Sequence, residues 1–360
     1  MGSGRNVTLK DVSVASGLSL ITVSRALRQP ELVHADTRAK VQRTIEELGY
    51  VPNLTARSLV SNRSNMIGVV VPILTSSLFA DLAQGIAGAL HEENIQMLLA
   101  VSQRSVDLEA EAVKTFMARQ ADAIIVTGFT HSESCRKLLT NFTGPIVETW
   151  NLRNEAVDMT VGYDNRKASA EMTKYLLAKG YSRIAMVGGA FENNDQAADR
   201  RDGFLDVMRE AGRSVPPEYI VSVPNPKLDA MRAEGREVPP EYIVSIPNPT
   251  TLESGWRAMM SLLEGPQKPD AVFFQAEIPA HGAMMACLAN GISVPGDVAI
   301  AGFGDLSLSA MLPVPLTTIK IPAREIGERA AQLVLERLNG APVQHRTLDV
   351  GFELMIRESA

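Results

Sequence analysis

The stretch VTLKDVSVASGLSLITVSRAL, residues 7–27, decides how the amino-terminal part of this chain folds. Thr8 and Asp11 have the spacing of a capping box, which predicts a helix over Leu9–Ser16. Gly17 ends that helix, because glycine adopts the left-handed backbone of a sharp turn at little cost. We therefore expect a short first helix that ends in a tight turn.

A second helix follows at once, over Leu20–Arg28, with Ser19 as its cap. Two short helices joined by a turn with glycine form a helix-turn-helix, whose second helix enters the DNA major groove. On spacing alone, an ordinary helical hairpin is the alternative. We expect one side of the pair to be buried through Val12, Ala15, Val23 and Leu27. The other side presents Ser19, Thr22, Ser24 and Arg25.

A third helix is predicted over Ala35–Leu48, with Val41 and Ile45 in its apolar stripe and Gly49 at its end. The segment from Pro52 to Asn62 is too short for a stable isolated helix, since helices under about 12 residues are marginal in water. It is interpreted as a linker that becomes helical on binding, with a flexible tether as the alternative.

Charge is unevenly distributed along the 360 residues, whose net charge is -6. Residues 1–65 hold nine Lys or Arg against five Asp or Glu, so this part is basic and the rest acidic. A basic head favours contact with phosphate. Cys135 and Cys287 form no CxxC motif and need no oxidising compartment. No apolar run approaches the ~20 residues of a membrane span, and we expect no signal peptide before the first helix. We expect a cytoplasmic protein.

From Met66 onward, short apolar runs alternate with amphipathic stretches. Strands are predicted over 66–72, 95–101, 121–128, 144–148, 159–164, 183–189, 271–275, 298–304 and 316–320. Helices are predicted over 78–93, 107–120, 132–141, 165–179, 196–211, 251–264, 279–290 and 322–338. Buried strands that alternate with helices indicate parallel sheets with helices on both faces. About 295 residues exceed one compact sheet, so we expect an α/β body of two lobes with a cleft.

One segment is duplicated. MREAGRSVPPEYIVSVPNP (208–226) recurs as MRAEGREVPPEYIVSIPNP (231–249), with 15 of 19 positions identical. A single tandem copy is too short for a solenoid. One YIVS is expected to supply a sheet strand, and the other to be a surface loop or an added edge strand.

The chain resembles the LacI/GalR family of bacterial transcriptional repressors over nearly its whole length. The most specific motifs are TLKDVSVASGLSLITVSRAL, TRAKVQRTIEELGYVPN and ARSL. VGYDN (161–165), RRDGF (200–204), VPGDVAIAGFGD (294–305) and LTTIKIP (316–322) look like the family's body motifs. GVVVPILTSSLFADLAQGI (68–86), PVPLTTI (313–319) and TLDVGFEL (347–354) look closest to the branch that responds to gluconate and related sugar acids.

The resemblance implies which residues contact DNA. Leu20, Ile21 and Arg25 would read bases, and Arg25 can offer two donors to guanine. Phosphate contacts, which set register, would come from Thr8, Ser19, Thr22, Ser24 and Asn53. Helix capping is the alternative role for the hydroxyls. PN-x-x-ARSL matches the family's hinge helix, which carries Ala56 and Leu59. Leu59 would wedge into the minor groove and kink the DNA.

The resemblance also implies a two-lobed body of the type I periplasmic-binding-protein kind, with an effector at the carboxyl ends of the strands. The residues at those ends are Leu74, Thr75, Ser76, Phe79, Thr127, Trp150, Asn151, Asp164, Arg200 and Glu277. Arg200 could hold a carboxylate or be a structural ion-pair partner, and Asp164 could instead cap the next helix. Phe79 and Trp150 could stack on carbon faces. Ala276-Glu277 replaces the family's usual Asn-Asp.

The predicted organisation is a helix-turn-helix domain over 1–50, a hinge over 51–64, and an effector-binding and dimerisation domain over 65–360. The predicted function is a repressor whose affinity for a near-palindromic DNA operator is set by a sugar acid such as gluconate or 2-ketogluconate. It would act as a homodimer. Whether it forms tetramers, and whether the ligand is an inducer or a corepressor, is left open. The alternative is a sugar receptor without a DNA role.

No enzyme is predicted. The five histidines have no metal-binding spacing such as HExxH, and the sequence contains no P-loop, GxGxxG or GxSxG. His131 and His281, near predicted strand ends, are interpreted as pocket lining. No cofactor, metal or membrane partner is expected.

Overall fold

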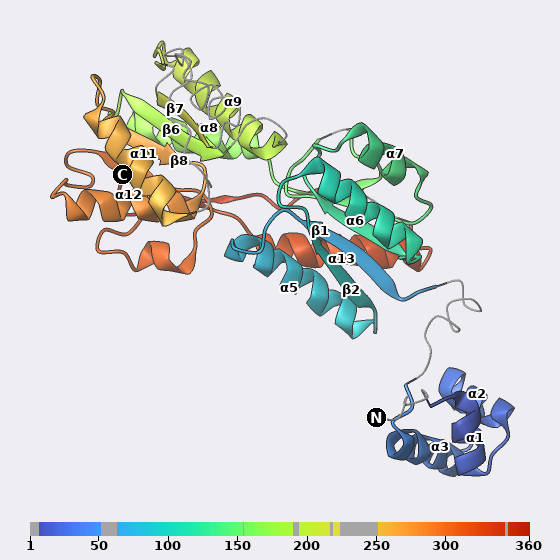
Figure 1. The fold of residues 1–360 in the computed structure, drawn as a ribbon. Coiled ribbons are helices and arrows are strands. Elements are labelled where there is room, and N and C mark those ends of the chain that lie inside the picture. Colours follow the sequence, from blue (N-terminus) through green and yellow to red (C-terminus); the bar gives the residue numbers. More distant parts are fainter. Residues whose placement is uncertain are drawn as a thin grey trace, which may run out of the picture. The chain divides into compact units, whose positions relative to one another are not determined.

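The computed structural model describes residues 7–51, 63–153, 155–189, 194–216, 219–223, 251–342 and 345–360. The chain divides into two compact units, Met1–Ser64 and Asn65–Ala360. Figure 1 shows the helical first unit and the α/β second unit. None of the described helices is long and apolar enough to cross a bilayer.

The first unit contains the three predicted helices, and their bounds agree with the prediction. They are α1 (Leu9–Ser16), α2 (Leu20–Arg28) and α3 (Ala35–Leu48), with a 3-10 turn η1 (Pro30–Leu32) before α3. Thr8 and Asp11 form the full capping box. Gly17 and Gly49 end α1 and α3 with φ of 66° and 63°, in the left-handed region that favours glycine. Each boundary therefore follows from a local residue preference.

The core of this unit is small. Val12, Val23 and Val41 are buried at its centre. Partly buried apolar side chains pack around them: Leu9, Leu18, Ala26, Ile45, Leu48 and Tyr50. The prediction that Ala15 and Leu27 belong to this core is wrong, since Ala15 is exposed and Leu27 only half-buried. Ser16 is buried instead. With 3.6 residues per turn, Ser16, four residues after Val12, lies closer to the face of Val12 than Ala15, three residues after it.

The second unit begins with a six-stranded parallel sheet in lobe one, in the order β11-β5-β4-β3-β1-β2. Its strands are β1 (Met66–Val71), β2 (Gln96–Val101), β3 (Ala123–Thr127), β4 (Ile146–Thr149), β5 (Met159–Gly162) and β11 (Thr347–Asp349). The expectation that every strand is buried on both faces is wrong for β2. It lies at the sheet edge, where Leu99 and Val101 are exposed.

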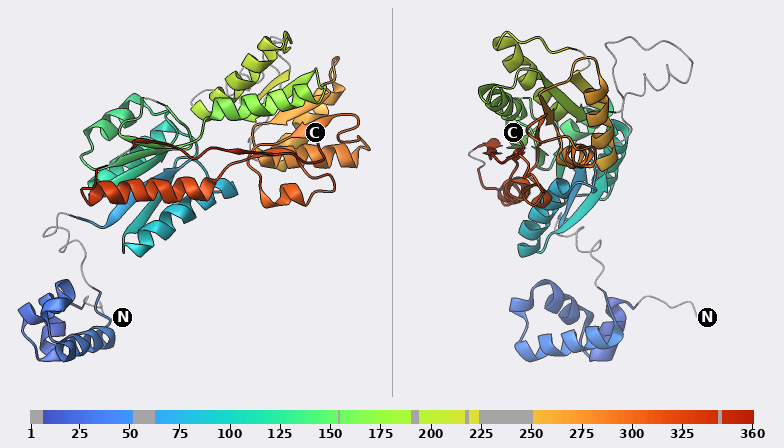
Figure 2. Two further views of the ribbon diagram at one scale, coloured as in Figure 1. Left: turned by 180° about the vertical axis from the view of Figure 1, so that it is seen from behind. Right: turned by 90° about the vertical axis from the view of Figure 1, so that its left-hand side faces the viewer.

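Helices cover both faces of this sheet because its strands are apolar on both sides. They are α5 (Ser77–Glu92) and α13 (Ala323–Leu338) on one face, and α6 (Val106–Ala118) and α7 (Glu133–Asn141) on the other. Along β1, Val69 and Val71 join the first core cluster and Val70 the second. α5 and α13 lie side by side (Figure 2). They approach so closely that a Cβ on Gly327 would lie 2.2 Å from the carbonyl oxygen of Leu82.

Lobe two repeats this plan around a four-stranded parallel sheet in the order β7-β6-β8-β9. The strands are β6 (Ile184–Gly189), β7 (Ile220–Val223), β8 (Ala271–Phe274) and β9 (Ala299–Ala301). Its helices are α8 (Asn165–Ala178), α9 (Asp195–Glu210), α11 (Leu252–Glu264) and α12 (Glu277–Ala289). Each strand and helix predicted for the body is present, which confirms the α/β fold of two lobes with parallel sheets.

The remaining features of the body are a small antiparallel strand pair and the duplicated segment. β10 (Thr318–Lys320) and β12 (Glu353–Met355) form a separate antiparallel pair, and neither β11 nor β12 was predicted as a strand. The first copy of YIVS supplies β7, which confirms that one copy joins a sheet. The second copy, 231–249, lies outside the described residues.

Candidate DNA-reading helix and effector cleft

Helix α2 presents an apolar and cationic surface that the core of the first unit does not use. Leu20 is 47% and Ile21 70% exposed, and Arg25, one turn further along the helix, is also exposed. Thr22 and Ser24 are half-buried beside them. Large apolar side chains grouped with a cation on one short helix are typical of a contact surface.

The hydroxyls predicted to hold phosphate also cap helices. The Thr8 side chain accepts from the backbone N–H of Asp11, and Ser19 accepts from that of Thr22. The Ser19 and Thr22 hydroxyls are also 2.8 Å apart. The capping alternative therefore describes Thr8 and Ser19 in this structure. The predicted hinge contacts lie outside the described residues: Asn53, Ala56 and Leu59.

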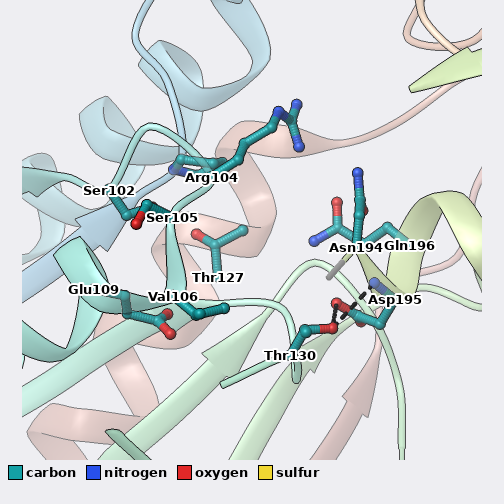
Figure 3. A pocket seen from close by; sticks show the side chains of 11 residues that line it. Ser102, Arg104, Ser105, Val106, Glu109, Thr127, Thr130, Asn194, Asp195 and Gln196 are labelled. Carbon is teal, nitrogen blue, oxygen red and sulfur yellow. Dashed lines mark hydrogen bonds between the residues drawn. The ribbon is translucent and has the colours of Figure 1, made fainter. Parts of the chain in front are cut away.

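A pocket lies between the lobes of the second unit, at the carboxyl ends of parallel strands (Figure 3). Its lining residues come from the ends of β1 and β3, the segment between β2 and α6 with the first turn of α6, the loop after β3, and the start of α9. They are Pro72, Ser102, Arg104, Ser105, Val106, Glu109, Thr127, Thr130, Asn194, Asp195 and Gln196. The empty volume is about 420 Å³, which includes space open to solvent.

Arg104 is the cation of this pocket, and sequence reasoning missed it. Gln103 and Arg104 have φ of 52° and 61°, in the left-handed region that non-glycine residues rarely adopt. Backbone strain of this kind concentrates at functional sites. Figure 3 shows the Arg104 side chain extending across the pocket above Thr127. The position of Arg104 just after a predicted strand of a parallel sheet could have indicated this role from the sequence.

Asp195, at the start of α9, connects the lobes across the pocket. Its carboxylate accepts from the backbone N–H of Phe129 and from the hydroxyl of Thr130, each at 3.3 Å. The Asn151 amide donates to Asp195 and to Asp199, both at 2.7 Å. These hydrogen bonds join the loop after β3 and the loop after β4 to α9. They link the two lobes directly.

Arg200, one turn further along α9, extends this network. It donates to the side chain of Asn165 at 2.7 Å and to the carbonyl of Gln275 and the hydroxyl of Tyr163 at 2.9 Å. Its guanidinium also stacks 4.0 Å from the ring centre of Phe303. All of these partners are neutral, and within the described residues Arg200 has no salt bridge.

The predicted aromatic ligand contacts are buried against each other. The Phe79 and Trp150 ring centres lie 4.8 Å apart, and Trp150 is only 2% exposed. Tyr163 and Phe303 extend the same cluster toward Arg200. The aromatic cluster therefore packs against Arg200, which belongs to the interlobe hydrogen-bond network.

The remaining predicted effector residues occupy varied positions. Thr127 lines the pocket, whereas Leu74 is exposed and Ser76 precedes α5 without a side-chain cap. Asp164 accepts from the backbone N–H of Lys167, so it caps α8 as the alternative proposed. The structure thus brings Thr127 together with lining residues that the sequence pattern did not single out.

Glu277 lies at the start of α12, in a buried polar chain. Its carboxylate accepts from the hydroxyls of Ser309 and of Thr318, the latter at 2.7 Å. Ser309 is in turn 2.7 Å from Nε2 of His281. Burial raises the pKa of the Glu277 carboxyl to about 7 and lowers the pKa of His281 to about 4. Ser309 is fully buried and directed at the carboxylate, an arrangement unlike that of an exposed nucleophile.

Three family models together match most of the chain. Residues 8–53 match the model of bacterial regulatory proteins of the lacI family, 64–233 the periplasmic binding protein and LacI-family sugar-binding domain, and 173–360 a periplasmic binding protein-like domain. The chain belongs to the LacI family. This confirms the resemblance seen in the sequence.

Relatives of this LacI-family chain are regulators of transcription. It is 31% identical to the HTH-type transcriptional regulator GntR of Pseudomonas aeruginosa over 352 residues, covering 98% of this chain and 95% of that protein. It is 30% identical to the transcriptional repressor CytR of Escherichia coli over 357 residues, covering 98% and 96%. A LacI-family regulator from Silicibacter pomeroyi has the same fold, with a TM-score of 0.84, 29% identity and coverage of 98% and 99%. The chain is a DNA-binding transcriptional repressor under effector control.

Glu277 gives this LacI-family body a pH-dependent stability. A carboxyl whose pKa rises on folding keeps its proton in the folded chain, so its contribution is present at low pH. That contribution is lost as the pH rises from about 4.5 to about 7. We expect the melting temperature of the wild type, relative to that of Glu277→Gln, to fall between about pH 4.5 and about pH 7. If the melting temperatures of the two proteins changed with pH in the same way, the raised pKa assigned to Glu277 would be wrong.

Proposed function

We propose that the protein represses transcription in response to a sugar acid such as gluconate or 2-ketogluconate, and acts in the cytoplasm on a near-palindromic operator. The chemistry of the pocket between the lobes carries this proposal. The similarity to GntR of Pseudomonas aeruginosa supports it.

The pocket combines one cation with several hydroxyl and amide groups. Arg104 forms no salt bridge with any residue that the structure describes, so its charge is available to a ligand carboxylate. Ser102, Ser105, Thr127 and Thr130 offer hydroxyls, which suit a polyhydroxylated ligand. Asp195 can accept from ligand hydroxyls, at the point where it already bridges the lobes. In this proposal the ligand strengthens or weakens that bridge.

Calorimetry with the purified protein tests the proposed ligand class. We expect gluconate or 2-ketogluconate to bind at least about tenfold more tightly than glucose, and Arg104→Gln to remove that preference. Arg119→Gln, an exposed arginine at the end of α6, is the control and should bind as the wild type does. Binding of glucose or a purine in place of either acid would contradict the proposal.

For DNA, we propose that α2 lies in the major groove, with Arg25 on a guanine and Leu20 and Ile21 against thymine methyl groups or the groove wall. Ser24 and Thr22 would contact phosphates at the same face. Leu59 remains the proposed minor-groove wedge. The exposure of Leu20, Ile21 and Arg25 supports this arrangement.

Arg25→Ala tests the reading helix. With a duplex that the wild type selects from a random-sequence pool, we expect the variant to bind roughly 5- to 150-fold more weakly, the equivalent of about 1–3 kcal/mol. Arg329→Ala, which removes an exposed arginine of α13, is the control and should leave binding unchanged. If the wild type selects no duplex at low salt, a sugar receptor without a DNA role would be the better account.

We further propose that the protein is a homodimer, because two-fold operators match two-fold protein symmetry. α11 and α12 present a groove lined in part by Leu252, Trp256, Gly282 and Met285, and Leu288 lies on the same two-helix layer. Leu252 is 42%, Trp256 37%, Met285 38% and Leu288 67% exposed. A second copy of the chain is the proposed occupant of this apolar surface.

Met285→Asp tests the dimer surface, since it would place a charge among these apolar side chains. We expect light scattering to give the mass of a monomer, and operator affinity to fall by at least about tenfold, because two linked heads bind more tightly than one. Leu108→Asp, at an exposed leucine on α6, should leave the dimer intact. A dimeric Met285→Asp would exclude this surface as the interface.

A further inference from the structure

Four side chains with metal-binding chemistry gather in lobe one, beside the pocket. They are Glu109 on α6, His131 in the loop between β3 and α7, Cys135 in the first turn of α7, and Glu148 on β4. The side chains of His131 and Glu148 are fully buried, Cys135 is buried, and Glu109 is only 6% exposed. Of these four residues, only Glu109 lines the effector pocket, and the function proposed above assigns no role to His131, Cys135 or Glu148.

Three of these residues place possible ligand atoms close together. One carboxylate oxygen of Glu109, one ring nitrogen of His131 and the Sγ of Cys135 all lie within 4.8 Å of one another. Tetrahedral zinc with bonds of about 2.0–2.3 Å separates its ligand atoms by roughly 3.5 Å. To share an ion, Oε2 of Glu109 and Nδ1 of His131, which are 2.8 Å apart, must therefore separate slightly, and the Sγ of Cys135 already lies within 4.8 Å of both.

The fourth residue orients the imidazole. Nε2 of His131 lies 3.2 Å from Oε1 of Glu148, and the other oxygen of Glu148 accepts from the backbone N–H of Val157 at 2.5 Å. This leaves Nδ1 of His131 directed toward Glu109, 2.8 Å from its Oε2. A carboxylate that holds the second ring nitrogen of a histidine is the usual outer partner of a metal-binding histidine.

We propose that Glu109, His131 and Cys135 bind a Zn²⁺ ion through Oε2, Nδ1 and Sγ, with Glu148 as the positioning residue of His131. Imidazole, thiolate and carboxylate together suit zinc better than the hard cations, which prefer oxygen alone. Three protein ligands leave one coordination position. Because Glu109 also lines the pocket, water from the pocket can fill that position.

The proposed ion would stiffen one wall of the cleft. It would tie α6 to the loop after β3, whose Phe129 and Thr130 bind Asp195 in the other lobe. Sequence spacing does not predict this site, because Glu109 is distant from His131 along the chain and HSESC matches no common zinc spacing.

Cobalt titration of the full chain, stripped of metal with a chelator and dialysed, tests the proposal. We expect one equivalent of Co²⁺ to bind with the near-ultraviolet absorption of a cobalt–thiolate bond, and Zn²⁺ to displace it. Cys135→Ser should lose that absorption. Cys287→Ser, which removes the buried cysteine of lobe two, is the matched control and should keep it.

Two further variants separate the roles. Glu148→Gln should weaken Co²⁺ binding by about 10- to 100-fold while the thiolate absorption persists at saturation. Glu109→Gln, at the edge of the pocket, should weaken binding at least as much, and keeps the test available if Cys135→Ser does not fold. Stoichiometric Co²⁺ without thiolate absorption, or no stoichiometric binding, would overturn the proposal and leave His131 as an ion-pair partner of its two carboxylates.

Discussion

The hydrogen bonds of Asp195 across the cleft are the interaction on which the account of this body depends. The carboxylate joins α9 to the loop after β3, and Asn151 joins it to the loop after β4. A ligand in the pocket must compete with these bonds or add to them, because Asp195 lines the same pocket. In the proposed function, the lobe angle and the occupancy of the pocket are coupled through this one side chain. This coupling is the physical basis that effector control requires.

A ligand can shift the lobes only by its difference in affinity for their two arrangements. Couplings of about 1–3 kcal/mol, typical of allosteric proteins, change the affinity of the second site by roughly 5- to 150-fold. Gaining or losing one or two charge-assisted hydrogen bonds at Asp195 is of that order. The neighbouring Arg200 network and the aromatic cluster beneath it supply a stiff support, since Tyr163 and Trp150 are almost fully buried. With such a rigid support, a small change in the hydrogen bonds at Asp195 could shift whole helices and strands of one lobe relative to the other.

Local signals in the sequence predicted the first unit almost completely, because capping side chains and left-handed glycines act within a few residues. Its core was predicted less well: Ala15 and Ser16 differ by one position, and one position on a helix decides between exposure and burial. In the body, apolar runs predicted each main strand. The pocket was predicted poorly, since Arg104, Asp195 and Gln196 come from separate loops that meet only in the folded chain. Conversely, Trp150 packs within an aromatic cluster, a role that residue type alone did not reveal, whereas Asp164 takes the helix-capping role that was the alternative.

The most direct test of the central claim is a DNA-binding measurement in which only the effector varies. Fluorescence anisotropy would follow the wild type on a labelled duplex selected from a random-sequence pool, at fixed salt, with and without saturating gluconate or 2-ketogluconate. The account predicts a change in duplex affinity of roughly 5- to 150-fold, in either direction. An unchanged affinity, with calorimetry showing the same acid bound to the protein, would contradict it.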